Sequence, residues 1–295
     1  MRFLTCWILL IVSFITATAQ DINLRTADGT THVETYGQGL PLLIINGGPG
    51  MNSVGFRGLA RTLGEDYRTI IYDQRGTGQS AIYPTDDQTI TMDKMVEDIE
   101  QIREHLKLKK WIVLGHSFGG MLASYYATKH PERIEGMILS SSGGINLEVF
   151  DGNHIHVNKR LSQLHQDSLA YWNGQIAAGD TSYHARLRRG YHLGPAYLYD
   201  QSYIDVIAKR LTQGNMVING LVFQNMRKID FNCEEKLTDF EAPVLIIQGK
   251  EDILDTYLSE YAHKVFPNST LILLDACAHY GWLDQPEKYF SALKT

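Results

Sequence analysis

The chain has 295 residues, of which 44% are apolar and 20% charged, and its formal net charge is −6 at pH 7. This is the composition of a globular protein with a large core. A mildly acidic chain without a basic run is poorly suited to bind nucleic acid or an anionic membrane surface, so we expect neither as a partner.

The first nineteen residues have the pattern of a secretory signal peptide. Residues 1–2 carry a positive charge, residues 3–15 are mostly apolar, and residues 17–19 read Ala-Thr-Ala, as at a cleavage site. The apolar run is too short to cross a bilayer as a helix. We therefore expect residues 1–19 to be a signal peptide and the mature protein to be exported, either periplasmic or secreted. The alternative is an uncleaved N-terminal anchor.

Short apolar runs alternate with longer amphipathic segments along most of the chain. The run at 31–36 alternates polar and apolar residues, as a half-buried strand does, whereas the other runs are typical of buried strands. Apolar residues three or four apart predict a helix over 93–106, and a second helix is expected from 121 to about 127. This alternation predicts an α/β fold, with a mostly parallel sheet covered by helices on both faces. The expected strands are 31–36, 41–46, 68–73, 110–115, 133–141, 242–249 and 269–276.

Residues 143–236 interrupt the strand–helix pattern. They are rich in Tyr, His, Asn, Gln and Arg, and their periodicity is helical where any exists, as in 203–211. We predict a helical cap over 143–236, laid on the carboxyl ends of the strands where open α/β sheets bind ligands. The core is then formed by 20–142 and 237–295.

The segment Gly-His-Ser-Phe-Gly-Gly, residues 115–120, places Ser117 between a predicted strand and a predicted helix. In a G-x-S-x-G motif the glycines permit a sharp turn that leaves the serine hydroxyl exposed, which is typical of a nucleophile elbow. A serine hydroxyl is a weak nucleophile at its free pKa and needs a base, together with a group that orients the base. His116, next to the serine, is expected to pack or to satisfy backbone groups instead.

Two later loops supply the partners that such a serine needs. Asp252 follows the strand at 242–249, and His279 follows the strand at 269–276. We predict that Ser117 is the nucleophile, His279 the base and Asp252 the group that orients it.

Three other acids lie near these positions. Glu251 and Asp255 flank Asp252, and Asp275 ends the next strand. Asp255 fits the N-cap of the helix that follows it.

The loop at 46–52, Asn-Gly-Gly-Pro-Gly-Met-Asn, follows an early strand and is suited to form an oxyanion hole. Its glycines let the backbone approach a substrate closely. We predict that the backbone N–H groups of Gly48 and Phe118 stabilise the oxyanion, with Gly47 as the alternative to Gly48.

The motifs NGGPG (46–50), DQRGTGQS (73–80) and GHSFGG (115–120), in this order, resemble those of the proline iminopeptidase group of the α/β-hydrolase fold, a family of serine exopeptidases. The resemblance covers nearly all of the chain outside the signal peptide and the cap. It implies an α/β-hydrolase fold. It also implies the same roles for the predicted catalytic and oxyanion residues, which are Ser117, His279, Asp252, Gly48 and Phe118. It also implies that Asp73, Arg75 and Gly76 stabilise the loop beside the site.

The chain departs from the family pattern at two places. Asn46 stands where the family usually has His. Family members hold the substrate's α-amino group with acidic side chains, but Ile253 follows Asp252 here, and residues 213–228 of the cap contain no acid. Glu251 or Asp255 is left to serve that role.

Cysteine and histidine spacing gives no sign of a metal or cofactor, and we expect neither. His154 and His156 form the H-x-H pattern without a supporting cluster of Cys, Asp or Glu. An exported compartment would permit a disulfide between Cys233 and Cys277, but their spacing does not establish one.

The sequence thus predicts an exported serine hydrolase that acts on a small molecule or short peptide. The leading hypothesis is an aminopeptidase that releases N-terminal proline or another small apolar residue. The alternatives are a carboxylesterase or lipase-like acylhydrolase and, from another class, a non-catalytic binding protein on the same fold.

Overall fold

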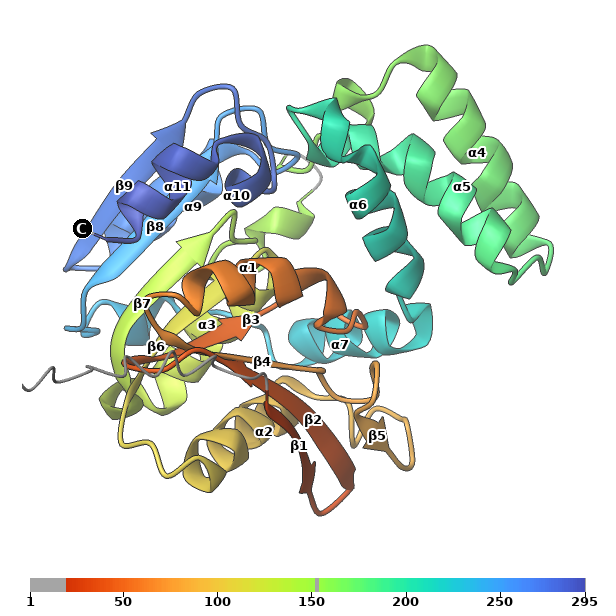
Figure 1. The fold of residues 1–295 in the computed structure, drawn as a ribbon. Coiled ribbons are helices and arrows are strands. Elements are labelled where there is room, and N and C mark those ends of the chain that lie inside the picture. The colour runs from red at the N-terminus through yellow and green to blue at the C-terminus, as the bar shows by residue number, and fades with distance from the viewer. Residues whose placement is uncertain (1–19, 152–153, 295) are drawn as a thin grey trace, which may run out of the picture.

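The computed structural model describes residues 20–151 and 154–294. Within these residues a nine-stranded sheet has the order β1-β2-β4-β3-β6-β7-β8-β9, with β5 paired to β2 (Figure 1). Strands β3, β4 and β6 to β9 are parallel, whereas β2 pairs antiparallel with its three neighbours. The strands are β1 Gln20–Arg25, β2 Gly29–Tyr36, β3 Pro41–Ile45, β4 Arg68–Tyr72, β5 Ala81–Ile82, β6 Trp111–His116, β7 Ile134–Ser140, β8 Val244–Gly249 and β9 Ser269–Leu274.

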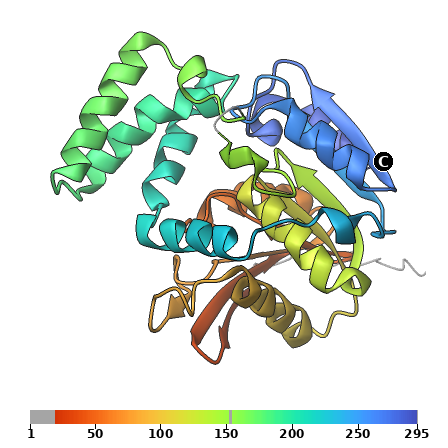
Figure 2. The same ribbon diagram turned by 180° about the vertical axis from the view of Figure 1, so that it is seen from behind.

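Helices cover both faces of the sheet, as the alternation of elements predicts. One face carries α1, α10 and α11, and the other carries α2, α3 and α9 (Figures 1 and 2). These helices are α1 Arg57–Leu63, α2 Met92–His105, α3 Phe118–Lys129, α9 Thr256–Val265, α10 Gly281–Asp284 and α11 Pro286–Ala292.

The period-two alternation of strand side chains divides the core into two layers. In β3, Leu43 and Ile45 pack into a cluster with residues of α2 and α3, whereas Leu42 and Ile44 pack into a cluster with residues of α1 and α11. All four side chains are at most 1% exposed. Each such burial contributes about 1.5–3 kcal/mol, so the sheet is anchored from both sides.

Strand β2 differs from its prediction as a half-buried strand, because six of its eight residues are buried. Its polar side chains are buried with partners: Glu34 pairs with Arg57 at 2.6 Å, and His32 lies 3.3 Å from Asp73. The alternation of polar and apolar residues in β2 therefore corresponds to a polar and an apolar face of the strand, and both faces are buried. The flanking strands β1 and β5, both paired with β2, have no counterpart in the prediction.

The interval between β7 and β8 is helical. Figures 1 and 2 show α4 and α5 side by side, projecting from the rest of the molecule. These helices are α4 Gln163–Ala177, α5 Tyr183–Leu193, α6 Ile204–Arg210, α7 Met216–Lys228 and the short α8 Glu234–Leu237. Single 3₁₀ turns are found at Val54–Phe56, Pro131–Arg133, Glu148–Phe150, Asn158–Arg160, Gly194–Tyr197, Gln201–Tyr203 and Leu211–Gln213. Helices α4 to α7 lie within residues 143–236, and we keep the name cap for that interval.

The helices of the described ranges include none that is long and apolar enough to span a bilayer. The predicted signal peptide, residues 1–19, lies outside the described residues and stays a prediction.

Candidate active site

Ser117 sits at the junction between β6 and α3 with φ 56° and ψ −123°. A positive φ is unfavourable for any residue with a Cβ and persists where its surroundings hold it. Here the Ser117 N–H donates to the carbonyl of Ser140 at 3.0 Å, and the Gly143 N–H donates to the carbonyl of Ser117 at 3.1 Å. The backbone is thus fixed on both sides, and Ser117 lines a cavity of about 430 Å³.

The glycines of the G-x-S-x-G motif are required by close packing at this turn. A Cβ on Gly115 would overlap the carbonyl oxygen of Gly119, and a Cβ on Gly119 would overlap that of Ile45. Neither glycine has a positive φ. The motif therefore owes its glycines to steric contact, as expected for a strand that turns directly into a helix.

His279 and Asp252 come together from the loops after β9 and β8. The Nδ1 atom of His279 lies 2.7 Å from Oδ1 of Asp252, and their side chains are 3% and 0% exposed. A carboxylate beside Nδ1 requires the hydrogen on that nitrogen, which leaves Nε2 as a proton acceptor. The Leu254 N–H also donates to Oδ1 of Asp252, at 3.2 Å. The imidazole is thus oriented as a general base requires.

His279 and Ser117 line the same cavity. Among the described residues, the Ser117 hydroxyl makes no hydrogen bond to the imidazole. Such bonds are often long in ligand-free enzymes and shorten when substrate binds.

The three neighbouring acids each have another partner. Glu251 accepts a hydrogen bond from the Cys277 N–H at 3.1 Å. Asp255 caps α9 by accepting from the Tyr257 N–H at 2.9 Å, as its sequence position predicts. Asp275 pairs with Lys250 at 2.6 Å. Neither Glu251 nor Asp255 lines the cavity, so neither is placed to bind a substrate's ammonium group there.

The loop after β3 passes directly over Ser117. A Cβ on Gly47 would lie 2.7 Å from the Cβ of Ser117, and Gly48, with φ 74°, turns the chain toward Met51. Phe118 is the first residue of α3, where N–H groups have no acceptor within the helix. Gly47 and Gly48 line the same cavity as Ser117, and Phe118 follows the serine in sequence, so the oxyanion donors Gly48 and Phe118, with Gly47 as the alternative, stay a prediction.

Asn46 closes this loop from its base. Its side-chain amide donates to the carbonyls of Gly47 and Met51, both at 3.1 Å. Gln74 in turn donates to the carbonyl of Asn46 at 2.8 Å. The asparagine that departs from the family pattern thus holds the loop through its own hydrogen bonds.

The cap binds the same loop from above. Arg210 at the end of α6 donates to the carbonyl of Gly47 at 2.9 Å, and Asn219 of α7 donates to that of Pro49 at 3.0 Å. The Asn215 N–H donates to the carbonyl of Gly50 at 2.8 Å. The position of the loop therefore depends on the cap.

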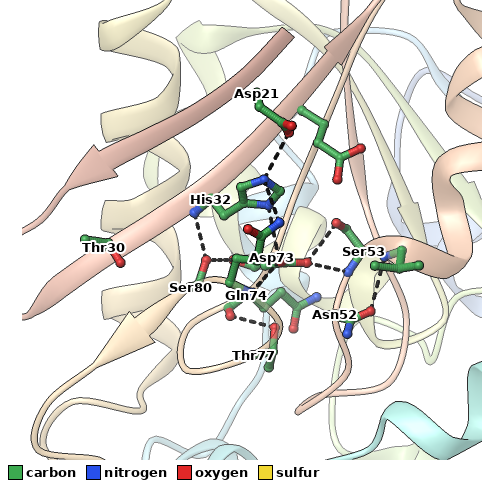
Figure 3. Close-up of polar contacts among 12 residues, drawn as sticks. Asp21, Thr30, His32, Asn52, Ser53, Asp73, Gln74, Thr77 and Ser80 are labelled. Carbon is green, nitrogen blue, oxygen red and sulfur yellow. Dashed lines mark hydrogen bonds and ion pairs between the residues drawn. The ribbon is translucent and has the colours of Figure 1, made fainter. Parts of the chain in front are cut away.

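Asp73 joins the segments next to this loop (Figure 3). Its Oδ1 accepts from both the N–H and the hydroxyl of Ser53, at 2.8 and 2.9 Å, and its Oδ2 accepts from the Gln79 N–H at 2.8 Å. Arg75 points elsewhere and pairs with the buried Asp98 at 2.7 Å. Both residues lie off the cavity wall, which agrees with the stabilising role that the motif implies.

His116 packs among aromatic rings and also lines the cavity beside Ser117 and His279. Its ring centroid lies 4.6 Å from that of His279 and 4.9 Å from that of Trp282. Complete burial holds the pKa of His116 well below its usual value, and the nearby imidazole of His279 acts in the same direction. His116 is thus a neutral packing residue that contacts the predicted base.

The cavity wall carries three arginines that the sequence did not single out. Arg186 and Arg189 come from α5, and Arg210 comes from α6. The described residues that line the cavity include no Asp or Glu. The basic run Arg-Leu-Arg-Arg at 186–189 is visible in the sequence. Which of its side chains line the cavity, however, depends on how α5 packs against its neighbours.

One group of side chains has the spacing of metal ligands. Asp21, His32 and Glu34 offer ligand atoms within 4.8 Å of one another (Figure 3 labels Asp21 and His32). Arg57, however, binds both carboxylate oxygens of Glu34. The Arg57 guanidinium thus already occupies the carboxylate of Glu34, so the group is better described as an ion-pair network than as a metal site.

The two cysteines and the H-x-H histidines have separate structural roles. Cys233 and Cys277 are buried free thiols, so the disulfide that the compartment would permit is not formed. His154 stacks on Tyr257, whereas His156 lies 3.2 Å from Asp255.

Comparison with known proteins agrees with this architecture. Residues 41–286 match the family model described as the α/β hydrolase fold. The chain is 26% identical over 263 residues to a proline iminopeptidase of Lactobacillus helveticus, covering 86% of this chain and 88% of that protein. It is 27% identical over 276 residues to a proline iminopeptidase of Neisseria meningitidis, covering 81% and 82%.

Among solved structures, an esterase from a Rhodococcus species superposes with a TM-score of 0.72 at 17% identity, covering 94% of this chain and 97% of that one. The likeness at this identity concerns the fold. The sheet order, the elbow at Ser117 and the match over 41–286 lead to one assignment: the chain belongs to the α/β hydrolase fold family and is similar to proline iminopeptidases at modest identity.

Proposed function

We propose that this protein is a serine hydrolase in which Ser117, His279 and Asp252 act as a catalytic triad on small esters or amides. The observation that carries the proposal is the 2.7 Å contact between His279 and Asp252 beside a cavity that Ser117 also lines. A buried carboxylate that orients an imidazole has its main chemical use where a nucleophile must be deprotonated.

The reaction would proceed in two halves. The hydroxyl oxygen of Ser117 attacks the substrate's carbonyl carbon, while Nε2 of His279 takes the hydroxyl proton and Asp252 stabilises the resulting imidazolium. The carbonyl oxygen becomes an oxyanion that accepts hydrogen bonds from the N–H groups of Gly48 and Phe118, each contributing about 3 kcal/mol. The leaving group departs with the proton from His279. Water then attacks the acyl-enzyme, gives its proton to His279, and the released serine recovers it.

The cavity favours small substrates without an ammonium group. A volume of about 430 Å³ suits a compact small molecule. Leaving an ammonium desolvated without a carboxylate costs several kcal/mol, and the described cavity wall has no carboxylate. We therefore place acylhydrolase activity first.

The second candidate is an aminopeptidase that releases N-terminal proline. It is favoured by the similarity to two proline iminopeptidases over more than four-fifths of the chain. In that case the substrate's ammonium group would bind to backbone carbonyls or side-chain amides instead of a carboxylate. A non-catalytic binding protein is the third candidate, and an oriented histidine beside the elbow argues against it.

Labelling with a fluorophosphonate probe tests whether the protein is a serine hydrolase. We expect covalent modification of Ser117 in the wild-type protein and none in the Ser117→Ala variant. A wild-type protein that stays unlabelled would favour the binding-protein reading.

Three substrates then separate the two enzyme activities: prolyl-naphthylamide, its N-acetylated form and a short p-nitrophenyl ester. We expect turnover of the ester. Hydrolysis of prolyl-naphthylamide that is lost on acetylation would instead establish the aminopeptidase.

We also propose that the protein is exported, on the signal-peptide pattern of residues 1–19. Cell fractionation with N-terminal sequencing tests this proposal. A mature chain beginning near Gln20 outside the cytoplasm is the expected result, and a full-length cytoplasmic chain would contradict it.

A further inference from the structure

The charged side chains that line the cavity are all basic apart from its histidines. Arg186, Arg189 and Arg210 line it, without a carboxylate among the described lining residues. We propose that the substrate itself carries a carboxylate, which Arg186 and Arg189 bind while Ser117 attacks an ester or amide elsewhere in the same molecule. This inference rests on the proposed serine hydrolase and specifies its substrate class.

Arg186 and Arg189 are placed on one face of α5, because residues three apart are neighbours on a helix. The Nε of Arg189 donates to Oδ1 of Asn173 in α4 at 2.7 Å, which orients its guanidinium. Arg186 makes one long hydrogen bond, at 3.4 Å, to the carbonyl of Thr212. Throughout the described chain, neither arginine forms an ion pair with a carboxylate, and both Nη groups of Arg189 lack a protein acceptor.

Arg210 extends the positive charge to the wall beside the serine. It is 4% exposed, lies 4.6 Å over the ring of Phe56 and bonds to backbone carbonyls. The other two buried arginines of the described chain have carboxylate partners: Arg75 pairs with Asp98, and Arg103 pairs with Glu100.

Of the three buried arginines Arg75, Arg103 and Arg210, only Arg210 has no carboxylate within ion-pair distance among the described residues. A buried cation without an anion is costly. The charge of Arg210 therefore raises the positive potential of the cavity, and an anionic ligand would lower that potential.

The chemistry of these groups selects the ligand. A guanidinium presents parallel N–H donors that match the two oxygens of a carboxylate, and such charge-assisted bonds are stronger than neutral ones. Ile176, Leu193 and Tyr197 line the same cavity as the arginines and the serine and supply apolar wall there. The substrate class is therefore a small carboxylate with an apolar linker and an ester or amide bond.

Two matched pairs of esters test this inference and locate the charge. On the acyl side, the p-nitrophenyl monoester of glutarate is compared with the same ester whose free carboxylate is methylated. On the leaving-group side, 4-acetoxybenzoate is compared with its methyl ester. We expect the wild-type enzyme to have a kcat/KM about 10- to 100-fold higher for the anionic member of one pair, the range that charge-assisted hydrogen bonds supply.

Substitution on α5 assigns the preference to its residues. The double variant Arg186→Gln and Arg189→Gln should lose the preference for the anionic ester, and Arg189→Lys should retain part of it because the charge remains. Arg188→Gln is the matched control, since this exposed arginine lies on the same helix but off the cavity wall. It should keep the wild-type preference.

The outcomes separate this inference from the proposed function. Equal turnover of charged and neutral esters by the wild-type enzyme would overturn the inference and leave the hydrolase intact. An equal loss of preference in Arg188→Gln and in the double variant would also overturn it. Failure to hydrolyse any of the four esters, together with an unlabelled Ser117, would overturn both.

Discussion

The imidazole of His279 lies 2.7 Å from the carboxylate of Asp252, and both side chains are almost completely buried. These residues are 27 positions apart in sequence and follow adjacent parallel strands, β8 and β9. The carboxyl ends of neighbouring parallel strands meet at one edge of a sheet, so the topology itself brings the two loops together.

Replacing Asp252 with Asn should reduce kcat about 10⁴-fold, because an amide that donates toward Nδ1 would leave the imidazole in the wrong tautomer. Steady-state kinetics on a neutral ester measures the change. Asp255→Asn is the matched control: Asn is as good a helix N-cap as Asp, so α9 should persist and activity should stay near that of the wild type. A similar loss of kcat in both variants would contradict the assignment of Asp252.

Removing the guanidinium in Arg210→Met should lower kcat for a neutral ester about 10- to 100-fold, since the loop at Gly47 would lose a charge-assisted hydrogen bond. The KM for the same ester should change less, because the loop acts on the developing oxyanion. Steady-state kinetics separates the two constants. Arg160→Met is the control, because Arg160 also bonds a backbone carbonyl, that of Ala196, away from the loop. Equal losses of kcat in both variants would point to general damage to the cap.

Adding one methyl group at Gly47 should lower kcat far more than adding one at Gly58. In Gly47→Ala the new Cβ would lie 2.7 Å from the Cβ of Ser117, so either the loop or the serine must shift. We expect kcat to fall about 100-fold, as for a misplaced reacting group.

In Gly58→Ala the Cβ meets nothing within 4 Å in the exposed face of α1, and helix propensity should raise the free energy of unfolding by about 0.5–1 kcal/mol. Urea unfolding and steady-state kinetics on both variants provide the measurements. Wild-type activity in Gly47→Ala would show that the loop is not confined as described.

The buried His116 should make the protein less stable as the pH falls. Its pKa is held well below the usual 6.5 in the folded state, so below pH 6.5 the unfolded chain binds a proton that the native state does not. The free energy of unfolding should therefore fall with decreasing pH, by up to about 1.4 kcal/mol per pH unit for this one group.

Urea unfolding between pH 4.5 and 7.5 should show a shallower pH dependence in His116→Leu, which has no proton to bind. Leucine is close in size to histidine and has no titratable group, so it fills the buried site among the aromatic rings of Tyr280 and Trp282. If the pH dependence of the free energy of unfolding were the same in His116→Leu as in the wild type, His116 would bind a proton as readily in the folded protein as in the unfolded chain.

Much of the fold was predictable because its signals are local. The apolar runs that became β3, β6 and β8 and the apolar stripe of α2 are properties of adjacent residues. The elbow at Ser117 is equally local, since its glycines are needed within one turn.

The burial of β2 was not predictable in this way. Glu34 is buried because Arg57 reaches it from α1, and His32 is buried against Asp73, which follows β4. An alternating strand is assigned one solvent face unless such distant partners are known.

The cavity arginines illustrate the same limit. Arg186 and Arg189 face the cavity because α5 packs between α4 and α6, and a cap of short helices carries no local signal for that arrangement.

The hydrogen bonds from the cap to the loop over Ser117 also define a unit for protein engineering. A cap transplanted from another member of the fold would remove the hydrogen bonds that Arg210, Asn219 and Asn215 donate to the carbonyls of Gly47, Pro49 and Gly50. A working chimera must therefore carry the segment from α6 to α7 together with residues 46–51, and exchange of substrate range is simplest by altering α4 and α5 alone.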